Sequence, residues 1–286
     1  MPIDYDLIKN WEFPEIEHTY TEKDTIIYAL SLGIGHDPLD TKQLQYIYEK
    51  ELKAFPTMAV ILGYPGLWMT NPKAKINFLK VVHGEQRLTI LKPLPKSGTI
   101  KAQSRVSHVI DKGVDKGALV IVERSIFDEN GTLLAVTEQT TFCRADGGFG
   151  QGDESPSALP KPPASSPDAI EEIEIRPDAA VLYRLNADPN PLHIDPEIAK
   201  AAGFDKPILH GLCTYGLAAH ALVKNYCDYQ AEHLLRFDTR FSSPVFPGET
   251  LVVEMWALND EEISFQAKVK ERDIVVLSNG IAKIKN

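Results

Sequence analysis

The sequence is poor in cysteine, has fewer cations than anions and contains no long apolar run. Its three cysteines, Cys143, Cys213 and Cys227, stand at no paired spacing, which predicts neither a disulfide framework nor a cysteine-rich zinc site. The 30 Lys and Arg are outnumbered by 40 Asp and Glu, and a net charge of −10 argues against general affinity for nucleic acid or an anionic membrane. Without a membrane-length run or the apolar core of a secretory leader, a cytoplasmic protein is expected.

The composition is that of an ordinary globular protein, and one segment divides the chain. Of its 286 residues, 43% are hydrophobic and 24% are charged. This length suits two domains of about 140 residues each. Residues 147–168 are so rich in Gly, Pro and Ser that they cannot hold a helical or strand period. We therefore predict a first domain over 1–146, a linker over 147–168 and a second domain over 169–286.

Both halves carry the same order of signals, which predicts two diverged copies of one fold. Tyr28 in a Tyr-x-Leu step corresponds to Tyr183 in another, and a proline-rich turn over 93–98 corresponds to one over 244–248. A long apolar helix is predicted over 211–226. The predicted strands cover 84–92, 98–111, 116–127 and 132–143 in the first half, and 170–175, 235–241, 251–257, 263–269 and 274–284 in the second.

These elements predict the α+β class, with a helix enclosed by a curved antiparallel sheet. Short helices are expected after Pro177 and from Pro196 to Gly203. The first half lacks an equivalent of the long helix, because prolines and glycines interrupt its apolar segment over 55–66.

A short polar run between prolines is the strongest functional signal. Asp188, Asn190 and His193 lie within six residues, and the prolines among them predict a stiff extended loop and not a helix. His210 and Gly211 follow after a short helical stretch. An acid, an amide and an imidazole on one loop are typical of a proton-transfer site.

The residues around this run resemble a known family. The Asp-x-Asn-Pro-x-His-x-Asp motif over 188–195, the stretch 203–211 and the strand and turn over 236–248 are similar to the MaoC-like, hydratase 2 family of (R)-specific 2-enoyl-CoA hydratases. Residues 83–86, 92–95 and 147–150 resemble the degenerate first repeat of its two-repeat, eukaryotic-type members. The resemblance implies a double hot dog fold, no metal and no organic cofactor. It also implies reversible addition of water to a trans-2-enoyl-CoA substrate, giving the (3R)-3-hydroxyacyl-CoA.

Hydration of an enoyl thioester needs a base for water, an acid for the α-carbon and donors for the thioester oxygen. Asp188 and His193 can supply the proton transfers, since the pKa of a desolvated carboxylate rises toward neutrality and that of imidazole already lies near it. Asn190 can fix one water between them. Gly211, at the expected start of the long helix, offers free N–H groups for an oxyanion. The family carries its catalytic pair and oxyanion donor at these positions, and which of the pair begins as base stays open.

Each of these residues also has a structural alternative. Asp188 alone could cap a turn, and His193 alone could be a hydrogen-bonded loop histidine. No metal is expected, because the loop offers no His-x-x-x-His or Cys partner. His210 could face substrate or belong to the helix cap, while Asp195 is better explained as a helix N-cap.

The first copy of the repeat cannot perform the same chemistry. Aligning its tyrosine with the second copy puts Gly33, Gly35 and Pro38 where the acid, the amide and the imidazole stand. We expect one active site per chain, and the resemblance implies that the interrupted segment around Gly63 leaves room for the acyl chain. His83 and His210 are further candidates for substrate contacts, and Lys206 is a candidate for the coenzyme A phosphates.

Rival functions share the thioester substrate. A (3R)-hydroxyacyl-ACP dehydratase would run the same chemistry backward. An acyl-CoA thioesterase or a non-catalytic acyl-thioester-binding module is less well supported, because neither needs an acid, an amide and an imidazole together. A homodimer paired through the sheets stays possible, and the sequence leaves acyl-chain length and pathway open.

Overall fold

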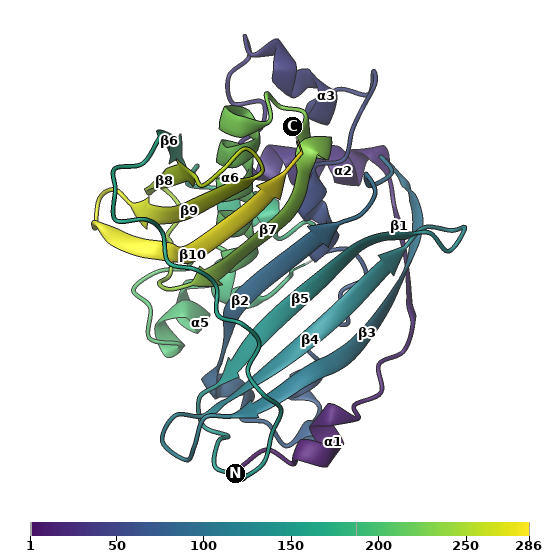
Figure 1. Cartoon of the computed structure of the whole chain (residues 1–286), viewed down its shortest axis with the longest axis vertical. Coiled ribbons are helices and arrows are strands. Elements are labelled where there is room, and N and C mark those ends of the chain that lie inside the picture. Colours follow the sequence, from purple (N-terminus) through teal and green to yellow (C-terminus); the bar gives the residue numbers. More distant parts are fainter. Residues whose placement is uncertain (1, 187, 286) are drawn as a thin grey trace.

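The computed structural model describes residues 2–186 and 188–285, and its frame is one antiparallel sheet of ten strands (Figure 1). The strand order is β1-β3-β4-β5-β2-β7-β10-β9-β8-β6, so each half of the chain contributes one half of the sheet. The first half supplies β1 (Ile16–Tyr20), β2 (Val81–Ile90), β3 (Gly98–Asp111), β4 (Ala118–Phe127) and β5 (Leu133–Cys143). The second half supplies β6 (Ala169–Glu174), β7 (Leu234–Phe241), β8 (Thr250–Ala257), β9 (Glu262–Val269) and β10 (Ile274–Ile284).

The two half-sheets join where β2 pairs with β7. Leu88 lies opposite Phe237 in this seam, and both are fully buried. Asp238 is also fully buried there, and its Oδ1 accepts the Leu88 N–H at 3.3 Å. Arg236 donates from Nε to the other carboxylate oxygen at 2.6 Å, so the buried charge is paired. Pairing and side-chain contacts together make one continuous sheet out of two copies.

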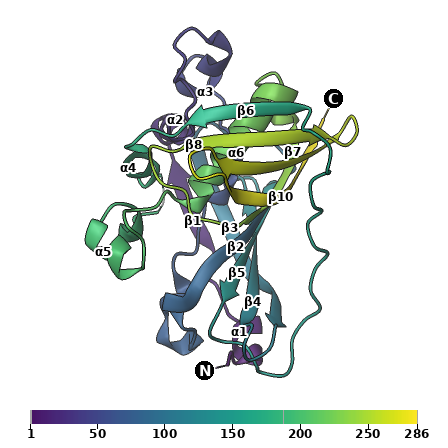
Figure 2. The same cartoon turned by 90° about the vertical axis from the view of Figure 1, so that its left-hand side faces the viewer.

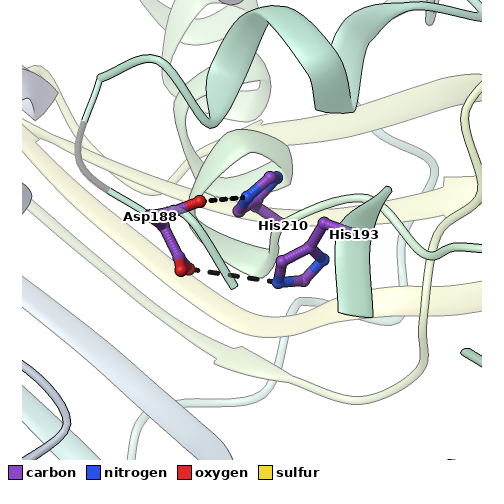
Figure 3. A group of neighbouring side chains, drawn as sticks. All are labelled: Asp188, His193 and His210. Carbon is purple, nitrogen blue, oxygen red and sulfur yellow. Dashed lines mark hydrogen bonds and ion pairs between the residues drawn. The ribbon is translucent and has the colours of Figure 1, made fainter. Parts of the chain in front are cut away.

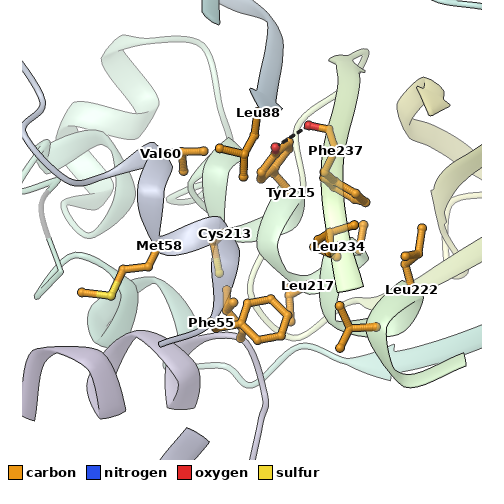
Figure 4. Packing of buried hydrophobic residues seen from close by; sticks show 14 of the residues in the cluster. Phe55, Met58, Val60, Leu88, Cys213, Tyr215, Leu217, Leu222, Leu234 and Phe237 are labelled. Carbon is orange, nitrogen blue, oxygen red and sulfur yellow. Dashed lines mark hydrogen bonds between the residues drawn. The ribbon is translucent and has the colours of Figure 1, made fainter. Parts of the chain in front are cut away.

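The helix α6 (Gly211–Tyr226) lies against the second half-sheet, and its residues 213–223 are all buried (Figures 2 and 4). Tyr215 donates its hydroxyl to the Phe237 carbonyl at 2.6 Å, and the ring of Phe237 stacks on Phe265 at 4.5 Å. Gly216 allows the first half to approach, since a Cβ there would lie 2.4 Å from Leu32. The predicted helix is confirmed, and it belongs to a core that both halves share.

The first half has no α-helix at the position that corresponds to α6 in the second half. Residues 55–66 contain only the 3₁₀ helix η2 (Pro56–Val60), whose five residues are all buried. The helix α2 (Glu22–Ser31) begins with a capping box between Thr21 and Asp24. The remaining elements of this half are short: α1 (Tyr5–Lys9), η1 (Thr41–Gln43), α3 (Leu44–Ile47), η3 (Trp68–Thr70), η4 (Pro72–Ala74) and η5 (Phe78–Lys80).

Most of the predicted elements are confirmed to within a few residues. In the second half α4 (Ala179–Tyr183) begins after Asp178 and so starts slightly later than expected. Asp195 is confirmed as the N-cap of α5 (Pro196–Ala201), because its side chain accepts the N–H groups of Glu197 and Ile198. The structure adds η6 (Pro191–His193) and η7 (Ala231–His233), which were not expected.

Residues 147–168 form neither helix nor strand and run along the outside of the sheet (Figure 2). They are nevertheless attached to the second half. The Trp256 Nε1–H donates to the Ser165 carbonyl at 2.8 Å, and Asn279 donates to the Leu159 carbonyl at 3.0 Å. The exact domain boundaries stay a prediction. No described helix combines the length and the apolarity that crossing a bilayer demands.

The buried His220 on α6 predicts how stability depends on pH. Its Nδ1–H donates to the Leu32 carbonyl at 2.9 Å, and burial lowers its pKa from 6.5 to about 4. Between these values the unfolded chain binds a proton that the folded chain does not, so stability is lost as pH falls from 6.5 toward 4. This ring should cost on the order of 1 kcal/mol at pH 5.5. Urea unfolding of His220→Gln at pH 7.5 and 5.5 should show a smaller loss than the parent, and an equal loss would contradict the assignment.

Candidate active site

The sequence predicts an extended polar loop between α4 and α5. The structure instead shows a turn at the centre of this loop. Asn190 accepts the Leu192 N–H at Oδ1, 3.1 Å away, and so caps the 3₁₀ turn η6. Pro191 occupies the first position of this turn, where its fixed φ is favourable. The side-chain oxygen of Asn190 therefore holds the turn that carries His193. Only the side-chain nitrogen of Asn190 is left for the predicted contact with water.

His193 is fixed in one orientation by its surroundings. The residue is 8% exposed, and its Nδ1–H donates to the Ile208 carbonyl at 2.9 Å. Burial lowers the pKa of His193 below 6.5, although that hydrogen bond and the charge of Asp188 act in the opposite direction. The ring is therefore neutral at pH 7, and its Nε2 lone pair lies 3.9 Å from the Asp188 Oδ2 (Figure 3).

Asp188 caps the turn, as one of the two alternatives expected, and its other carboxylate oxygen faces His193. The capping atom is Oδ1, which accepts the Asn190 N–H at 3.1 Å, and the atom facing His193 is Oδ2. The side chain is 45% exposed. Our expectation of a desolvated carboxylate is wrong for this structure, because nearly half of the side chain is open to solvent.

His210 lies directly against the pair. Its ring stacks on His193 with centroids 3.7 Å apart and an angle of 27°, and its Nε2–H donates to the Asp188 backbone carbonyl at 3.2 Å (Figure 3). Tyr183 covers it from another side at 5.0 Å, leaving the residue 2% exposed. Burial, aided by His193, lowers the pKa of His210 to about 3. The ring is enclosed and holds the loop that carries Asp188, and its contact with substrate stays a prediction.

The helix α6 begins at Gly211, immediately after this stacked pair. Within the described part of the chain the Gly211 N–H has no acceptor, as expected for a first helical residue. A Cβ at this position would lie 3.3 Å from the ring of Phe241. Phe241 in turn contacts His83 of the first half, with centroids 4.5 Å apart. The N–H that we expected to bind an oxyanion is therefore unoccupied by protein and lies next to His210.

The three other predicted contacts differ in where they lie. His83 adjoins the site because its ring contacts Phe241, which lies against Gly211, and burial lowers the pKa of His83 to about 4. Lys206 is exposed and its Nζ lies 5.2 Å above the ring of Phe246. Gly63 has a φ of +60°, and a Cβ on it would lie 2.3 Å from Ala102. Gly63 is thus required for close packing against β3, and a larger residue there would strain the backbone and would not simply fill a pocket.

Sequence reasoning missed that three residues could hold a cation. Asp188, His193 and His210 each offer one ligand atom, and these atoms lie within 4.8 Å of one another. We expected no metal because the loop has no second histidine nearby in sequence, but the fold supplies His210 from the end of another segment. Each ring has one nitrogen engaged with a backbone carbonyl and one nitrogen left over. A metal-free site therefore stays a prediction.

Two further residues near the site were also missed. Burial raises the pKa of Tyr64, and the charge of Asp188 adds to this effect. The guanidinium of Arg124 lies 5.8 Å from the Tyr64 ring. A signal existed for Arg124, because it occupies the inward phase of a strand in which Val122 and Ile126 are apolar.

The fold and the site together define a double hot dog protein with an Asp–His pair at the start of its central helix. A crystal structure of a MaoC-like dehydratase from Phytophthora capsici superposes with a TM-score of 0.87 at 36% identity and covers 98% of both chains. A Mycobacterium tuberculosis protein described as a double hot dog fold superposes with a TM-score of 0.59 at 14% identity, which supports the fold alone. The predicted fold is confirmed.

Family models match both halves of the chain. The MaoC like domain matches residues 159–279, and the MFE-2 hydratase 2 N-terminal domain matches residues 18–145. The chain therefore belongs to the MaoC-like, hydratase 2 family.

Relatives of this family match over the whole chain. It is 39% identical to the probable enoyl-CoA hydratase 2 of Dictyostelium discoideum, over 99% of this chain and 97% of the relative. It is 37% identical to an Arabidopsis thaliana protein named enoyl-CoA hydratase 2, peroxisomal, over 96% of this chain and 93% of the relative. The mouse peroxisomal multifunctional enzyme type 2 is 36% identical, but this chain spans only 37% of it.

The hydrogen bonds of the two histidines lead to a spectroscopic prediction. At pH 7 we expect His193 as the neutral Nδ1–H tautomer and His210 as the neutral Nε2–H tautomer, because a carbonyl holds each proton and burial lowers both pKa values. Nitrogen-15 NMR of histidine-labelled protein distinguishes the tautomers, and His210→Asn assigns the second set of signals. An imidazolium signal from His210 at pH 6 would contradict the enclosure described above.

Proposed function

We propose that the protein hydrates trans-2-enoyl-CoA reversibly to (3R)-3-hydroxyacyl-CoA. The class of enzyme is hydro-lyase, which is the activity in the names of the relatives described above. The observation that carries the proposal is the separation of 3.9 Å between the His193 Nε2 and the Asp188 Oδ2, beside the start of α6. One water could hydrogen-bond to both atoms at this separation.

The two side chains divide the proton transfers between them. In hydration, His193 Nε2 accepts a proton from water as the water oxygen forms a bond to C3 of the enoyl group. The oxygen keeps its second proton as the 3-hydroxyl group, and Asp188, in its carboxylic acid form, donates a proton to C2. The proton taken by His193 then returns to Asp188, so both side chains are restored for the next turnover. His193 is favoured as the base because its Nδ1–H is already held by Ile208, which leaves Nε2 as the acceptor. In dehydration the same transfers run in reverse.

The start of α6 supplies the third requirement. As water adds, negative charge moves onto the thioester oxygen, and a helix N-terminus stabilises such charge through its free N–H groups and dipole. The Gly211 N–H has no acceptor within the described residues and lies next to the stacked histidines. We infer that this group receives the thioester oxygen.

The remaining parts of the substrate have a less detailed assignment. We propose that the first half receives the acyl chain, because its segment over 55–66 lacks the helix that fills the second half. Lys206 is exposed four residues before His210, and we retain it as a candidate for binding the coenzyme A phosphates. The chemistry above requires no organic cofactor and no metal, and we propose that none takes part.

The dehydratase direction is the second candidate function. A Mycobacterium tuberculosis relative named 3-hydroxyacyl-thioester dehydratase Y is 37% identical over 91% of this chain. The same site would serve an acyl-carrier-protein thioester. A cytoplasmic location and a homodimer stay predictions, and the location is not supported by relatives whose names place them in peroxisomes.

Removing either proton carrier should abolish hydration. Asp188→Asn and His193→Gln nearly preserve volume, so each should fold normally and lose on the order of 10²- to 10⁴-fold in kcat. The matched control is Asp195→Asn, because Asn also caps helices and Asp195 serves as the N-cap of α5. Spectrophotometric assay of crotonyl-CoA measures all three. Near-normal turnover in either catalytic variant would remove that residue from the mechanism.

Stereochemistry gives an independent test. A single water held on one face of the enoyl group should yield the (3R)-hydroxyacyl-CoA, which chiral chromatography of the product identifies. Mainly (3S) product would overturn the placement of the water. Release of free coenzyme A from saturated acyl-CoA would instead favour the thioesterase.

A further inference from the structure

Arg124 on β4 is a buried cation that the proposed mechanism does not use. It is 5% exposed, and its Nη2 donates to the Val60 carbonyl at 2.6 Å. Its Nε has no hydrogen-bond partner among the described residues. No described carboxylate lies within ion-pair distance of it. Burial lowers the pKa of Arg124 to about 10, so the side chain stays charged at neutral pH.

The position of Arg124 in the sheet is polar where its surroundings are apolar. Ser104 on β3 and Thr137 on β5 lie directly opposite Arg124, so the three side chains share one face of the sheet. Along the same phase of β4, Ile126 belongs to the larger hydrophobic cluster and Val122 to a separate smaller one. The polar row thus marks the boundary between two cores that do not merge.

This row lies beneath the segment that replaces the missing helix. Val60, whose carbonyl Arg124 holds, ends η2, and Tyr64 follows in the same segment. The guanidinium lies 5.8 Å from the Tyr64 ring. Arg124 therefore lies against the segment that we propose to receive the acyl chain, and one of its donors is unused.

Packing alone does not account for an arginine here. A buried cation with no carboxylate partner is costly, and an apolar residue of similar size would fill the space without that cost. An unpaired guanidinium is suited to a carboxylate, with which it forms charge-assisted, often bidentate hydrogen bonds.

We propose that Arg124 binds a carboxylate carried by the acyl chain of the substrate, with Ser104 and Thr137 as neighbouring polar groups. The preferred substrates are then enoyl-CoA thioesters of dicarboxylic acids, with the second carboxylate at the distal end of the chain. This inference rests on the proposed hydratase function and names a substrate class for the same site.

The test compares substrates matched in length. We would measure kcat/KM for methyl-ended and carboxyl-ended trans-2-enoyl-CoA of six, eight, ten and twelve carbons. The carboxyl-ended member should be preferred at least tenfold at one or more lengths, because a charge-assisted bond contributes about 1.5–3 kcal/mol. Arg124→Met should bring that ratio near one, and Arg124→Lys should restore part of it. The matched control is Arg105→Met on β3, which removes an exposed arginine paired with Glu123 and should keep the parent ratio.

Two outcomes would overturn the proposal. One is a preference of the parent protein for the methyl-ended member at every length. The other is an equal loss on both members of each pair in Arg124→Met, which would make the residue structural. Calorimetric binding of saturated decanoyl-CoA and its carboxyl-ended analogue, neither of which can be hydrated, measures the same preference without catalysis. Binding therefore tests this inference even if the protein does not hydrate enoyl-CoA. The comparison of the two ligands on the parent protein tests it even if Arg124→Met does not fold.

Discussion

The pairing of β2 with β7 is the constraint on which the rest of the structure depends. Asp188, His193 and His210 come from the second half, whereas His83, Tyr64 and Arg124 come from the first. The seam holds the two sets in register, and the buried Asp238 ties its side chain to the backbone of the opposite strand. The contact of Gly216 with Leu32 brings the first half directly onto the central helix. The junction thereby fixes the proposed catalytic loop on one copy relative to the region proposed for the acyl chain on the other.

Within that frame the site is organised by neutral histidines. His210 touches both members of the proposed pair, since it stacks on one and donates to the backbone of the other. A positive charge on either stacked ring is disfavoured, because the neighbouring buried ring keeps solvent away from it. In the proposed mechanism, the proton taken by His193 is thus held in an unfavourable environment. The arrangement favours a base that passes its proton on over one that keeps it.

Periodic features could be predicted from the sequence, and contacts between distant segments could not. The alternation of β8 and β9 and the unbroken apolar stretch of α6 each specify local structure, because burial on one face imposes a period. The stacking of His210 on His193 depends on the direction in which α5 returns the chain, and no local pattern encodes it. Burial of Asp188 was inferred from its chemistry and is wrong, since exposure depends on which segments cover the loop. Arg124 shows the useful exception, a charge in an inward strand phase.

Joining the two copies in one chain also changes what substitution can do. In a pair of identical chains every replacement occurs twice, so breaking a core helix would remove it from both partners at once. Here residues 55–66 have lost the helix while α6 keeps it, and the shared sheet is preserved. Linkage through residues 147–168 frees one copy from the catalytic requirements of the other. Asymmetry of this kind lets a single scaffold change its range of substrates while its chemistry stays the same.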